Sequence, residues 1–356
     1  MHNATGEVIG ILGSYEDITE RKLAEESLKE FSQGLHRMAE STADKSGQKF
    51  FDSCVLALVT LLEMPVAVIG AVDPKRPGIL RSMAFYRDGD LIDGGEIDLV
   101  DSPLTEAART RSLVRVADEV REYHPDNPFL REIKANAFVG YPITQANGDI
   151  CGYLCAMGPE PLKRSLEKAK IIIELLAGRI AVEMERCWAM EELEREIDRA
   201  NLLESISRQI RASFDPDEIV QSAIARLGAG MKLDRCLILS YHVTPKPELI
   251  VTAEHVVDGV SSIDEAYDIK VDGNPFIEAL VSNDTVIASN DVLSDPLLSV
   301  SAEMLRKTGV KSMMAVQTSY QNQVNGVLML QQCQDFREWT RDDEDLLKAV
   351  ADMVGI

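Results

Sequence analysis

Two stretches of this sequence, FVGYPITQANGDICGYLCAM at residues 138–157 and SMMAVQTSYQNQVNGVLMLQ at residues 312–331, decide the fold. Each has an apolar run, a polar turn and a second apolar run, which is the pattern of a β-hairpin. Aligned without a gap, the two stretches place Gly152 and Gly326 at the same position. The sequence therefore predicts an internal repeat in which both copies contain the same hairpin.

The repeat extends to both sides of the hairpins. Downstream, ELLAGRIA (174–181) aligns with KAVADMVG (348–355) at the same offset. Upstream, VLALVTLLEMPVAVIGAVD (55–73) and AIARLGAGMKLDRCLILSYH (223–242) each read as a helix that leads into a buried strand. Two units of about 150 residues follow, which is a usual domain size. Hairpins that alternate with helices predict an α+β fold, with an antiparallel sheet flanked by helices in each unit.

A long helix is expected between the two units. Residues 164–215 contain no proline and one glycine, so nothing in this segment ends a helix. Some 45 helical residues at 1.5 Å each would extend about 70 Å, which is more than one domain core can cover. Ile172–Ile180 reads as a stripe that packs on its own domain.

Beyond that stripe, apolar residues continue at heptad-like spacing. Met190, Leu193 and Ile197 lie on a segment otherwise rich in Glu and Arg, and a second stripe follows, displaced from the first, at Leu203, Ile206 and Ile210. An exposed apolar row of this kind predicts a helix-to-helix seam between two copies of the chain. We expect a parallel homodimer, although the sequence alone also permits antiparallel pairing.

The N-terminal segment has a strand followed directly by a charged helix. Val8–Tyr15 reads as a single strand without a sheet of its own. From Asp17 onward the residues favour a helix, with Leu28, Phe31 and Leu35 on a second coiled-coil seam.

Composition excludes several classes of function. Against 59 acidic residues the chain has only 37 basic ones, and the net charge of −22 repels nucleic acid and anionic membrane surfaces. No apolar run approaches the ~20 residues of a membrane span, so we expect a cytoplasmic protein without direct membrane insertion.

The six cysteines form no disulfide-like framework. Cys151 and Cys155, expected on one face of a strand about 13 Å apart, are too distant to share a metal.

Three parts of the chain carry a family resemblance. GEVIGILGSYEDITERKLAEESL (6–28) resembles the closing strand and exit helix of a PAS sensor domain, in which Asp17, Ile18 and Thr19 would form the signal-relay junction. The first unit resembles GAF domains through residues 129–157 and AGRIAVEMER (177–186). The second does so through LDRCLILSYH (233–242), residues 309–339 and EDLLKAVADMVGI (344–356), and it is similar to the GAF domains of cyanobacterial-type multidomain sensors.

The resemblance implies a division of the chain. Residues 1–18 would be the remnant of a PAS domain and 19–42 a signalling helix. Residues 43–185 would be the first GAF domain, 186–212 the connecting helix and 213–356 the second GAF domain. The chain would then be a regulatory fragment of a larger enzyme such as a sensor histidine kinase of a two-component system.

No cofactor is assigned by this resemblance. Some GAF domains of this type hold a linear tetrapyrrole through a Cys-His pair, but DPLLSVSAEMLRKTGVKS (295–312) contains neither residue, and LMLQQC (328–333) has glutamine where chromophore binders often carry histidine. The N-K-x-n-F-x-x-x-D-E pattern of cyclic-nucleotide binders is also missing. The ligand remains unknown, and we expect any pocket to be walled by residues 275–281 and 296–304 in the second unit and 103–108 and 129–133 in the first.

Enzyme-like motifs have simpler structural interpretations. DGGEID (93–98) resembles the active-site turn of diguanylate cyclases but lacks the expected phenylalanine, so Gly94-Gly95 is interpreted as a hairpin turn. The acidic residues 342–345 are expected to complement a helix dipole behind Thr340 as N-cap, not to bind metal. We find no catalytic residues and no metal site in the sequence.

The sequence therefore predicts a sensory and dimerisation module that relays the state of a ligand or partner through long helices to an output domain, without enzymatic activity of its own. Two alternatives stay open. One is a photoreceptor or small-molecule sensor with a noncovalent chromophore or ligand in a GAF pocket. The other is a structural spacer whose pockets are filled by side chains, and the volume of the pockets distinguishes it from a sensor.

Overall fold

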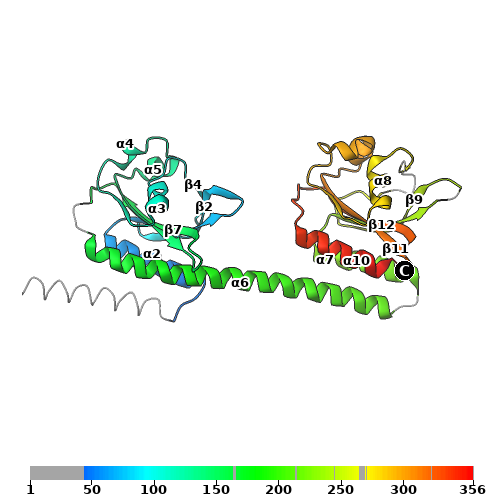
Figure 1. Cartoon of the computed structure of the whole chain (residues 1–356), viewed down its shortest axis with the longest axis horizontal. Helices are drawn as coiled ribbons and strands as arrows, with labels where there is room; N and C mark the ends of the chain where they lie inside the picture. The colour runs from blue at the N-terminus through cyan, green and yellow to red at the C-terminus, as the bar shows by residue number, and fades with distance from the viewer. Residues whose placement is uncertain are drawn as a thin grey trace, which may run out of the picture. The chain divides into compact units, whose positions relative to one another are not determined.

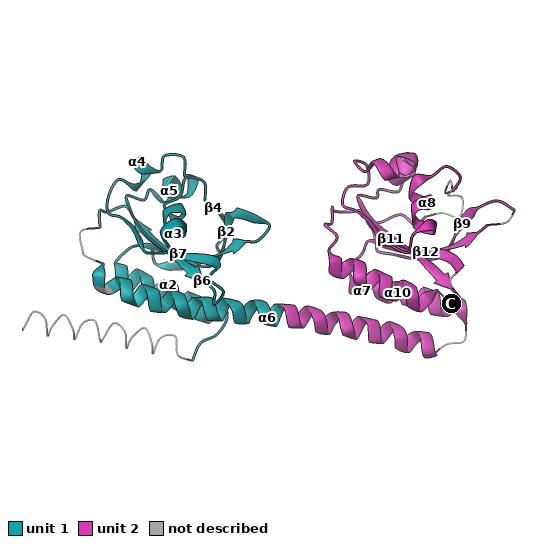
Figure 2. Cartoon of the chain, in the orientation of Figure 1, with its two compact units in different colours: residues 1–191 teal, residues 192–356 magenta. Residues whose placement is uncertain are grey.

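The computed structural model describes residues 44–162, 166–212, 215–243, 245–263, 269, 271–321 and 323–355. The chain divides into two compact units between Glu191 and Glu192, shown in separate colours in Figure 2. The residues predicted to form a PAS remnant and an N-terminal seam, Asp17, Ile18, Thr19, Leu28, Phe31 and Leu35, lie outside the described residues.

Unit 1 is an antiparallel sheet with helices on both faces (Figure 1). Its strands lie in the order β3-β2-β1-β7-β6-β5, and β4 also pairs with β2. Helix α2 and the first part of α6 pack on one face, while α3, α4 and α5 pack on the other. The elements are α2 (Gln48–Leu62), β1 (Val66–Asp73), β2 (Arg76–Arg87), β3 (Asp90–Ile92), β4 (Glu96–Asp98), α3 (Leu104–Thr110), β5 (Val114–Val116), α4 (Val120–Tyr123), α5 (Pro128–Ile133), β6 (Ala137–Thr144), β7 (Ile150–Gly158) and α6 (Glu167–Ala212).

Unit 2 has the same layers. Its sheet runs β10-β11-β12-β8-β9, with the end of α6, α7 and α10 on one face and α8, η1 and α9 on the other. The elements are α7 (Pro216–Gly230), β8 (Arg235–His242), β9 (Glu248–Val256), α8 (Pro275–Ser282), β10 (Ile287–Ser289), the 3-10 helix η1 (Pro296–Ser301), α9 (Ala302–Lys307), β11 (Ser312–Tyr320), β12 (Gln323–Gln332) and α10 (Arg341–Val354). The predicted α+β class, with an antiparallel sheet flanked by helices, is confirmed in both units.

The two sheets share their irregularities as well as their strand order. A bulge interrupts the β1–β2 pairing after Ile69, and the β8–β9 pairing is interrupted after Ile238 in the same way. Each central hairpin also has a bulge beside its glycine, where Gly152 pairs with Ile143 and Gly326 pairs with Thr318. Bulges are specific features of a sheet, so their agreement supports a true structural repeat.

In the first strand of the two hairpins, the ungapped sequence alignment differs from the structural correspondence by one residue. The structure pairs Phe138 with Met157 and Met313 with Gln331, so Phe138 corresponds to Met313 and not to Ser312. The reason is the length of the connection: the segment between the paired residues Thr318 and Gly326 is shorter by one residue than that between Ile143 and Gly152.

Two local predictions in unit 1 were wrong. Cys151 and Cys155 were expected on one face of β7, but they belong to the clusters on opposite faces of the sheet. Cys151 is the bulged residue, since the neighbouring pairs are Ile143 with Gly152 and Thr144 with Ile150, and one extra residue reverses the alternation of side chains.

Gly94-Gly95 is not a hairpin turn. The strands on either side of these glycines, β3 and β4, both pair with β2. The glycines therefore separate two short edge strands that run along β2 one after the other. A Cβ at Gly94 would lie 2.0 Å from Oγ of Ser82. Glycine is needed here because two segments of the same chain approach each other closely. The hairpin turn between β2 and β3 instead lies at Asp88 and Gly89, both with positive φ.

The predicted long helix is confirmed as α6, a continuous helix of 46 residues. Its first part places Ile173, Ile180 and Met184 in the core of unit 1. Its last part places Ile206 in the core of unit 2, with Leu203 and Ile210 packed beside it. The second predicted stripe is therefore a core stripe, because α7 and the sheet of unit 2 cover it.

Candidate functional site

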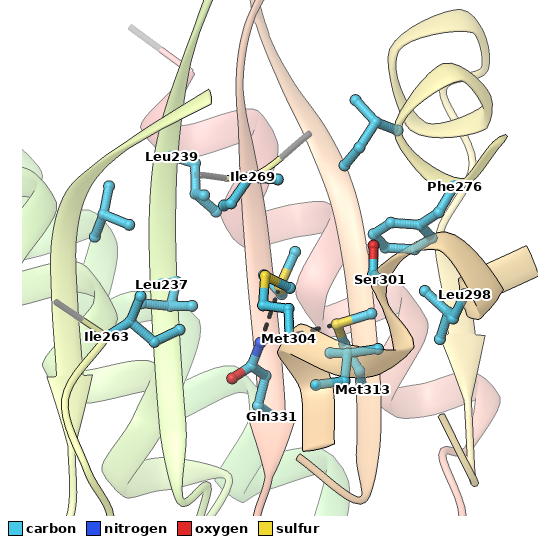
Figure 3. A pocket seen from close by; sticks show the side chains of 14 residues that line it. Leu237, Leu239, Ile263, Ile269, Phe276, Leu298, Ser301, Met304, Met313 and Gln331 are labelled. Carbon is cyan, nitrogen blue, oxygen red and sulfur yellow. Dashed lines mark hydrogen bonds between the residues drawn. The ribbon is translucent and has the colours of Figure 1, made fainter. Parts of the chain in front are cut away.

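A cavity lies in unit 2 between the sheet and the layer formed by α8, η1 and α9. Its volume of about 30 Å³ is enough for the centres of about two water molecules. Figure 3 shows its walls, which are apolar apart from Ser301 and Gln331. The lining residues are Leu237, Leu239, Val251, Ile263, Ile269, Phe276, Ile277, Leu298, Ser301, Met304, Leu305, Met313, Met329 and Gln331. The walls expected from the sequence, 275–281 and 296–304, are both part of it.

The helical side of the cavity is positioned by two N-caps. The side chain of Asn274 accepts a hydrogen bond from the backbone N–H of Phe276, and the side chain of Asp295 accepts one from Leu297. A proline follows each cap at the first helical position, where its fixed φ suits a helix start. Nδ2 of Asn274 also donates to Oγ of Ser301 at 3.1 Å, which joins the start of α8 to the end of η1.

Gln331 is the buried polar residue of the cavity, with 1% of its surface exposed. Its Oε1 accepts a hydrogen bond of 2.8 Å from Nη1 of Arg235. Its Nε2 faces two thioether sulfurs, 3.1 Å from Sδ of Met329 and 3.8 Å from Sδ of Met313 (Figure 3). Thioethers are weak acceptors, so the amide nitrogen is poorly satisfied.

Arg235, the hydrogen-bond partner of Gln331, is completely buried. Its Nη2 donates to the backbone carbonyls of Ser261 and Thr308, the latter at 3.4 Å. Its Nε lies 3.3 Å from Oε1 of Glu254, close enough for an ion pair, but it is not aligned for a hydrogen bond. A buried guanidinium needs such compensation, so the network fixes the start of β8 against the loop after β9 and the turn after α9.

Glu254 completes the network on the side of β9. Its Oε1 accepts from the backbone N–H of Ile263 at 2.9 Å, and Oε2 accepts from Oγ of Ser262. The cavity wall at Ile263 is thereby held by the same carboxylate that pairs with Arg235.

Unit 1 has a smaller cavity at the corresponding place. Its volume is about 10 Å³, and Leu104, Phe129 and Leu130 are among its walls, as expected from the sequence. The positions that correspond to Arg235 and Gln331 through strand pairing are Val66 and Met157. Unit 1 therefore has no counterpart of the polar pair.

Burial raises the pKa of each of the six cysteine thiols. Burial raises the pKa of Cys54 and of Cys155 to about 12 and that of Cys151 to about 11. Burial also raises the pKa values of Cys236 and Cys333. A thioether link to a chromophore requires a thiolate, and none of these environments favours one.

The predicted seam residues of α6 are exposed. Met190, Leu193 and Ile197 have 47%, 50% and 50% of their surface exposed, in the part of α6 between the two cores. Three further residues of α6, Ile171, Leu175 and Val182, are also exposed although unit 1 packs on the other side of the helix. Only Leu175 lies within the stripe Ile172–Ile180 that was expected to pack on its own domain, and Ile171 and Val182 were not singled out from the sequence.

Thr340 caps α10 as predicted. Its Oγ1 accepts from the backbone N–H of Asp343, whose carboxylate accepts from the backbone N–H of Thr340.

Among the residues that the structure describes, no three His, Cys, Asp or Glu side chains gather in a way that could hold a metal ion. Within the same residues, no helix is both long and apolar enough to cross a membrane.

Sequence reasoning also missed Arg235 and the role of Gln331. Both signals were present: an arginine opens the apolar run RCLILSYH, and a glutamine ends the run VLMLQ. The sequence alone does not show whether a polar residue at the end of a buried strand faces the core, because a shift of the strand register by one residue reverses the direction of its side chain.

Part of unit 2 matches a known domain family. Residues 215–356 match the model of the GAF domain family. A putative methyl-accepting chemotaxis protein of Synechocystis sp. is 19% identical over 236 residues, which cover 65% of this chain and 23% of that protein. The chain thus spans about a quarter of the length of this relative.

The chain is also similar to solved structures. The phycocyanobilin-bound GAF domain of a cyanobacterial phytochrome is 22% identical, with 44% of this chain and 91% of that chain covered and a TM-score of 0.39. The phycoerythrobilin-bound GAF domain of a cyanobacterial phytochrome is 20% identical, with 45% and 94% covered and a TM-score of 0.40.

Proposed function

We propose that the chain is a sensory and regulatory segment of a bacterial signalling protein, because residues 215–356 match the model of the GAF domain family. The observation that carries this proposal is the shared helix: α6 supplies Met184 to the core of unit 1 and Ile206 to the core of unit 2. A change in packing on α6 within one unit therefore acts on an element that the other unit also needs. Signal relay further requires that this connection have two states and that the ligand bind them with different affinity.

Unit 1 is, in this proposal, a second GAF domain. The support is internal to the chain: both units have the same strand order, the same helical layers and bulges at corresponding places. The N-terminal residues would be the tail of a PAS domain, and the whole segment would be cytoplasmic and without catalytic activity. It would act on the output domain of a larger protein such as a histidine kinase.

Hydrogen bonds in unit 2 connect the cavity to the helices on the opposite face of the sheet. Next to Gln331, the amide of Gln332 accepts from the backbone N–H of Asp234 and donates to the carbonyl of Lys232, in the turn that follows α7. Arg337 donates to the carbonyl of Met231 at 2.7 Å and pairs with Asp343, a residue of the α10 capping box. A shift at the end of β12 would reach both α7 and α10 by this route.

The cavity favours a small ligand over a large chromophore. Pockets for drug-sized ligands occupy about 300–1,000 Å³, and the cavity of unit 2 is about 30 Å³. A linear tetrapyrrole would have to displace most of the walls. The third interpretation, a spacer with filled pockets, fits unit 1 better, because its cavity is smaller and has no poorly satisfied buried amide.

We further propose that the segment forms a homodimer through α6. Ile171, Val182 and Leu193 follow one another at intervals of 11 residues on the exposed side of the helix. An 11-residue period keeps such residues on one face of a nearly straight helix. A second copy would cover this row and the seam at Met190 and Ile197, and parallel pairing would deliver both signals to the same end.

Relay through α6 can be tested by weakening one unit and observing the other. Ile173→Ala creates a cavity in unit 1, and Trp339 fluorescence reports on unit 2, because Trp339 packs against the core of that unit. We expect the denaturation midpoint seen by Trp339 in a Trp188→Phe background to fall with Ile173→Ala. The pair Glu194→Gly and Glu196→Gly should weaken this effect, since glycines loosen a helix interior, whereas alanines at the same places should preserve it. Independence of the Trp339 transition from Ile173→Ala would contradict relay.

A further inference from the structure

The amide nitrogen of Gln331 is a hydrogen-bond donor inside an apolar cavity. The side chain is 1% exposed, and the acceptors near Nε2 are the sulfurs of Met329 and Met313. A buried donor left without a good acceptor costs free energy, so the folded protein gains if a better acceptor enters.

The orientation of the amide is fixed by its neighbour. Arg235 has only donor groups, and its Nη1 lies 2.8 Å from the Gln331 side chain, so the oxygen of the amide must face it. The opposite orientation would place N–H groups against N–H groups. The nitrogen is therefore directed toward the cavity, as Figure 3 shows.

A second donor faces the same space. Oγ of Ser301 lines the cavity and accepts from Nδ2 of Asn274, which leaves the hydroxyl hydrogen of Ser301 to donate. The other lining side chains are Leu, Ile, Val, Phe and Met, without a charged group. An ionised ligand would lose its hydration without gaining a partner in these walls.

We propose that this cavity recognises a small, neutral molecule with an apolar body and a carbonyl or ether oxygen, and that Gln331 Nε2 donates the hydrogen bond that selects it. This inference rests on the proposed sensory function of unit 2. The ligand oxygen would replace the sulfur of Met329 as the acceptor of the amide. Unit 1 would not share the specificity, because Met157 stands where unit 2 has Gln331.

The proposed ligand needs more space than the cavity offers, and the methionines of its walls can provide it. Met304, Met313 and Met329 contribute three flexible side chains to a space of about 30 Å³. Unbranched thioether chains change rotamer with little loss of packing, so they can withdraw to admit a ring of five or six heavy atoms. Movement of Met329 would also free the amide from its weak partner.

Two isosteric probes test the role of the oxygen. Cyclopentanone and methylenecyclopentane differ only in an oxygen against a CH₂ group, and binding can be followed by NMR of ε-methyl-labelled methionines and of the side-chain amide of Gln331. We expect cyclopentanone to bind about three to ten times more tightly, the factor of one hydrogen bond, and to shift the Gln331 amide resonances. Gln331→Glu keeps an acceptor for Arg235 but has no N–H, so the preference should disappear. Gln323→Glu makes the same change at an exposed position of β12 and should retain it.

The possible results separate the two proposals. Equal affinity of the two probes in the unaltered protein, or a ketone preference that survives Gln331→Glu, would overturn the assignment to Gln331 but leave the sensory pocket. Methionine methyl signals that neither probe moves up to its solubility limit would overturn the pocket itself. If Gln331→Glu fails to fold, the amide shift of the unaltered protein with the ketone alone still decides the assignment.

Discussion

Gly152 and Gly70 face each other so closely across β7 and β1 that a Cβ at Gly152 would lie 2.3 Å from the carbonyl oxygen of Gly70. Unit 2 repeats this contact, since a Cβ at Gly326 would lie 2.5 Å from the carbonyl oxygen of Leu239. Both obstacles are backbone atoms in paired strands, so they cannot withdraw as a flexible side chain can. The glycine shared by the two hairpins is required by the approach of the neighbouring strand.

Gly152→Ala should therefore destabilise unit 1 by about 3 kcal/mol, at the upper end of overpacking effects. Chemical denaturation followed by Trp188, which packs against the core of unit 1, would measure it. Gly178→Ala is the control: no atom lies within 4 Å of its Cβ position in α6, and alanine there should stabilise by up to about 1 kcal/mol. A neutral effect of Gly152→Ala would show that the sheet adjusts.

The buried polar pair of unit 2 should be strongly coupled in stability. Arg235→Val alone leaves Gln331 and Glu254 without their cationic partner and should cost about 3–5 kcal/mol. Combining it with Gln331→Met, which installs the residues of unit 1, should recover a large part of that loss. A double-mutant cycle monitored by Trp339 gives the coupling free energy, and additive effects would contradict the prediction.

The proposed dimer should depend on the exposed side of α6. Leu193→Glu with Ile197→Glu would oppose like charges along the seam, so the dimer should dissociate. Light scattering during size-exclusion chromatography would show the mass fall from two chains to one. Val243→Glu with Ile250→Glu changes two apolar residues of unit 2 with comparable exposure and should leave the mass unchanged. A single-chain mass for the unaltered protein would rule out the dimer.

Acid should remove one specific contact of unit 1. The side-chain hydrogen bond from Arg186, aided by the backbone N–H of Gly47, lowers the pKa of Glu183 below its usual 4.5. A lowered pKa in the folded state means that the stabilisation is complete above pH 4.5 and is lost as the pH falls through the folded value. The free energy of unfolding of Glu183→Gln should therefore lie below that of the unaltered protein at pH 6, and the gap should narrow toward pH 3. A gap independent of pH would contradict this account.

The sequence was sufficient for the repeat, the α+β class and the long helix, because these depend on hydrophobic period and on the absence of helix breakers. It was insufficient wherever one residue of register decides the outcome. A bulge places Cys151 on the face of the sheet opposite to the expected one. Phe138 was aligned one position away from Met313, its counterpart in unit 2. Gly94-Gly95 separates two edge strands instead of forming a hairpin turn. The cavity depended on the same register, since Arg235 and Gln331 become a pair only when β8 and β12 are aligned.

The two sets of core residues on α6 also bear on how the length of the helix can vary during evolution. An insertion between Met184 and Ile206 leaves both sets of core contacts in place, because each unit keeps its own part of the helix. One inserted residue instead turns the second set by about 100° around the helix axis relative to the first, and seven or eleven residues restore the direction to within about 20°. Under the proposed relay, homologous chains should therefore differ in the length of this segment by such steps, and a family of natural sequences would carry that periodicity as a record of the direction that the relay requires.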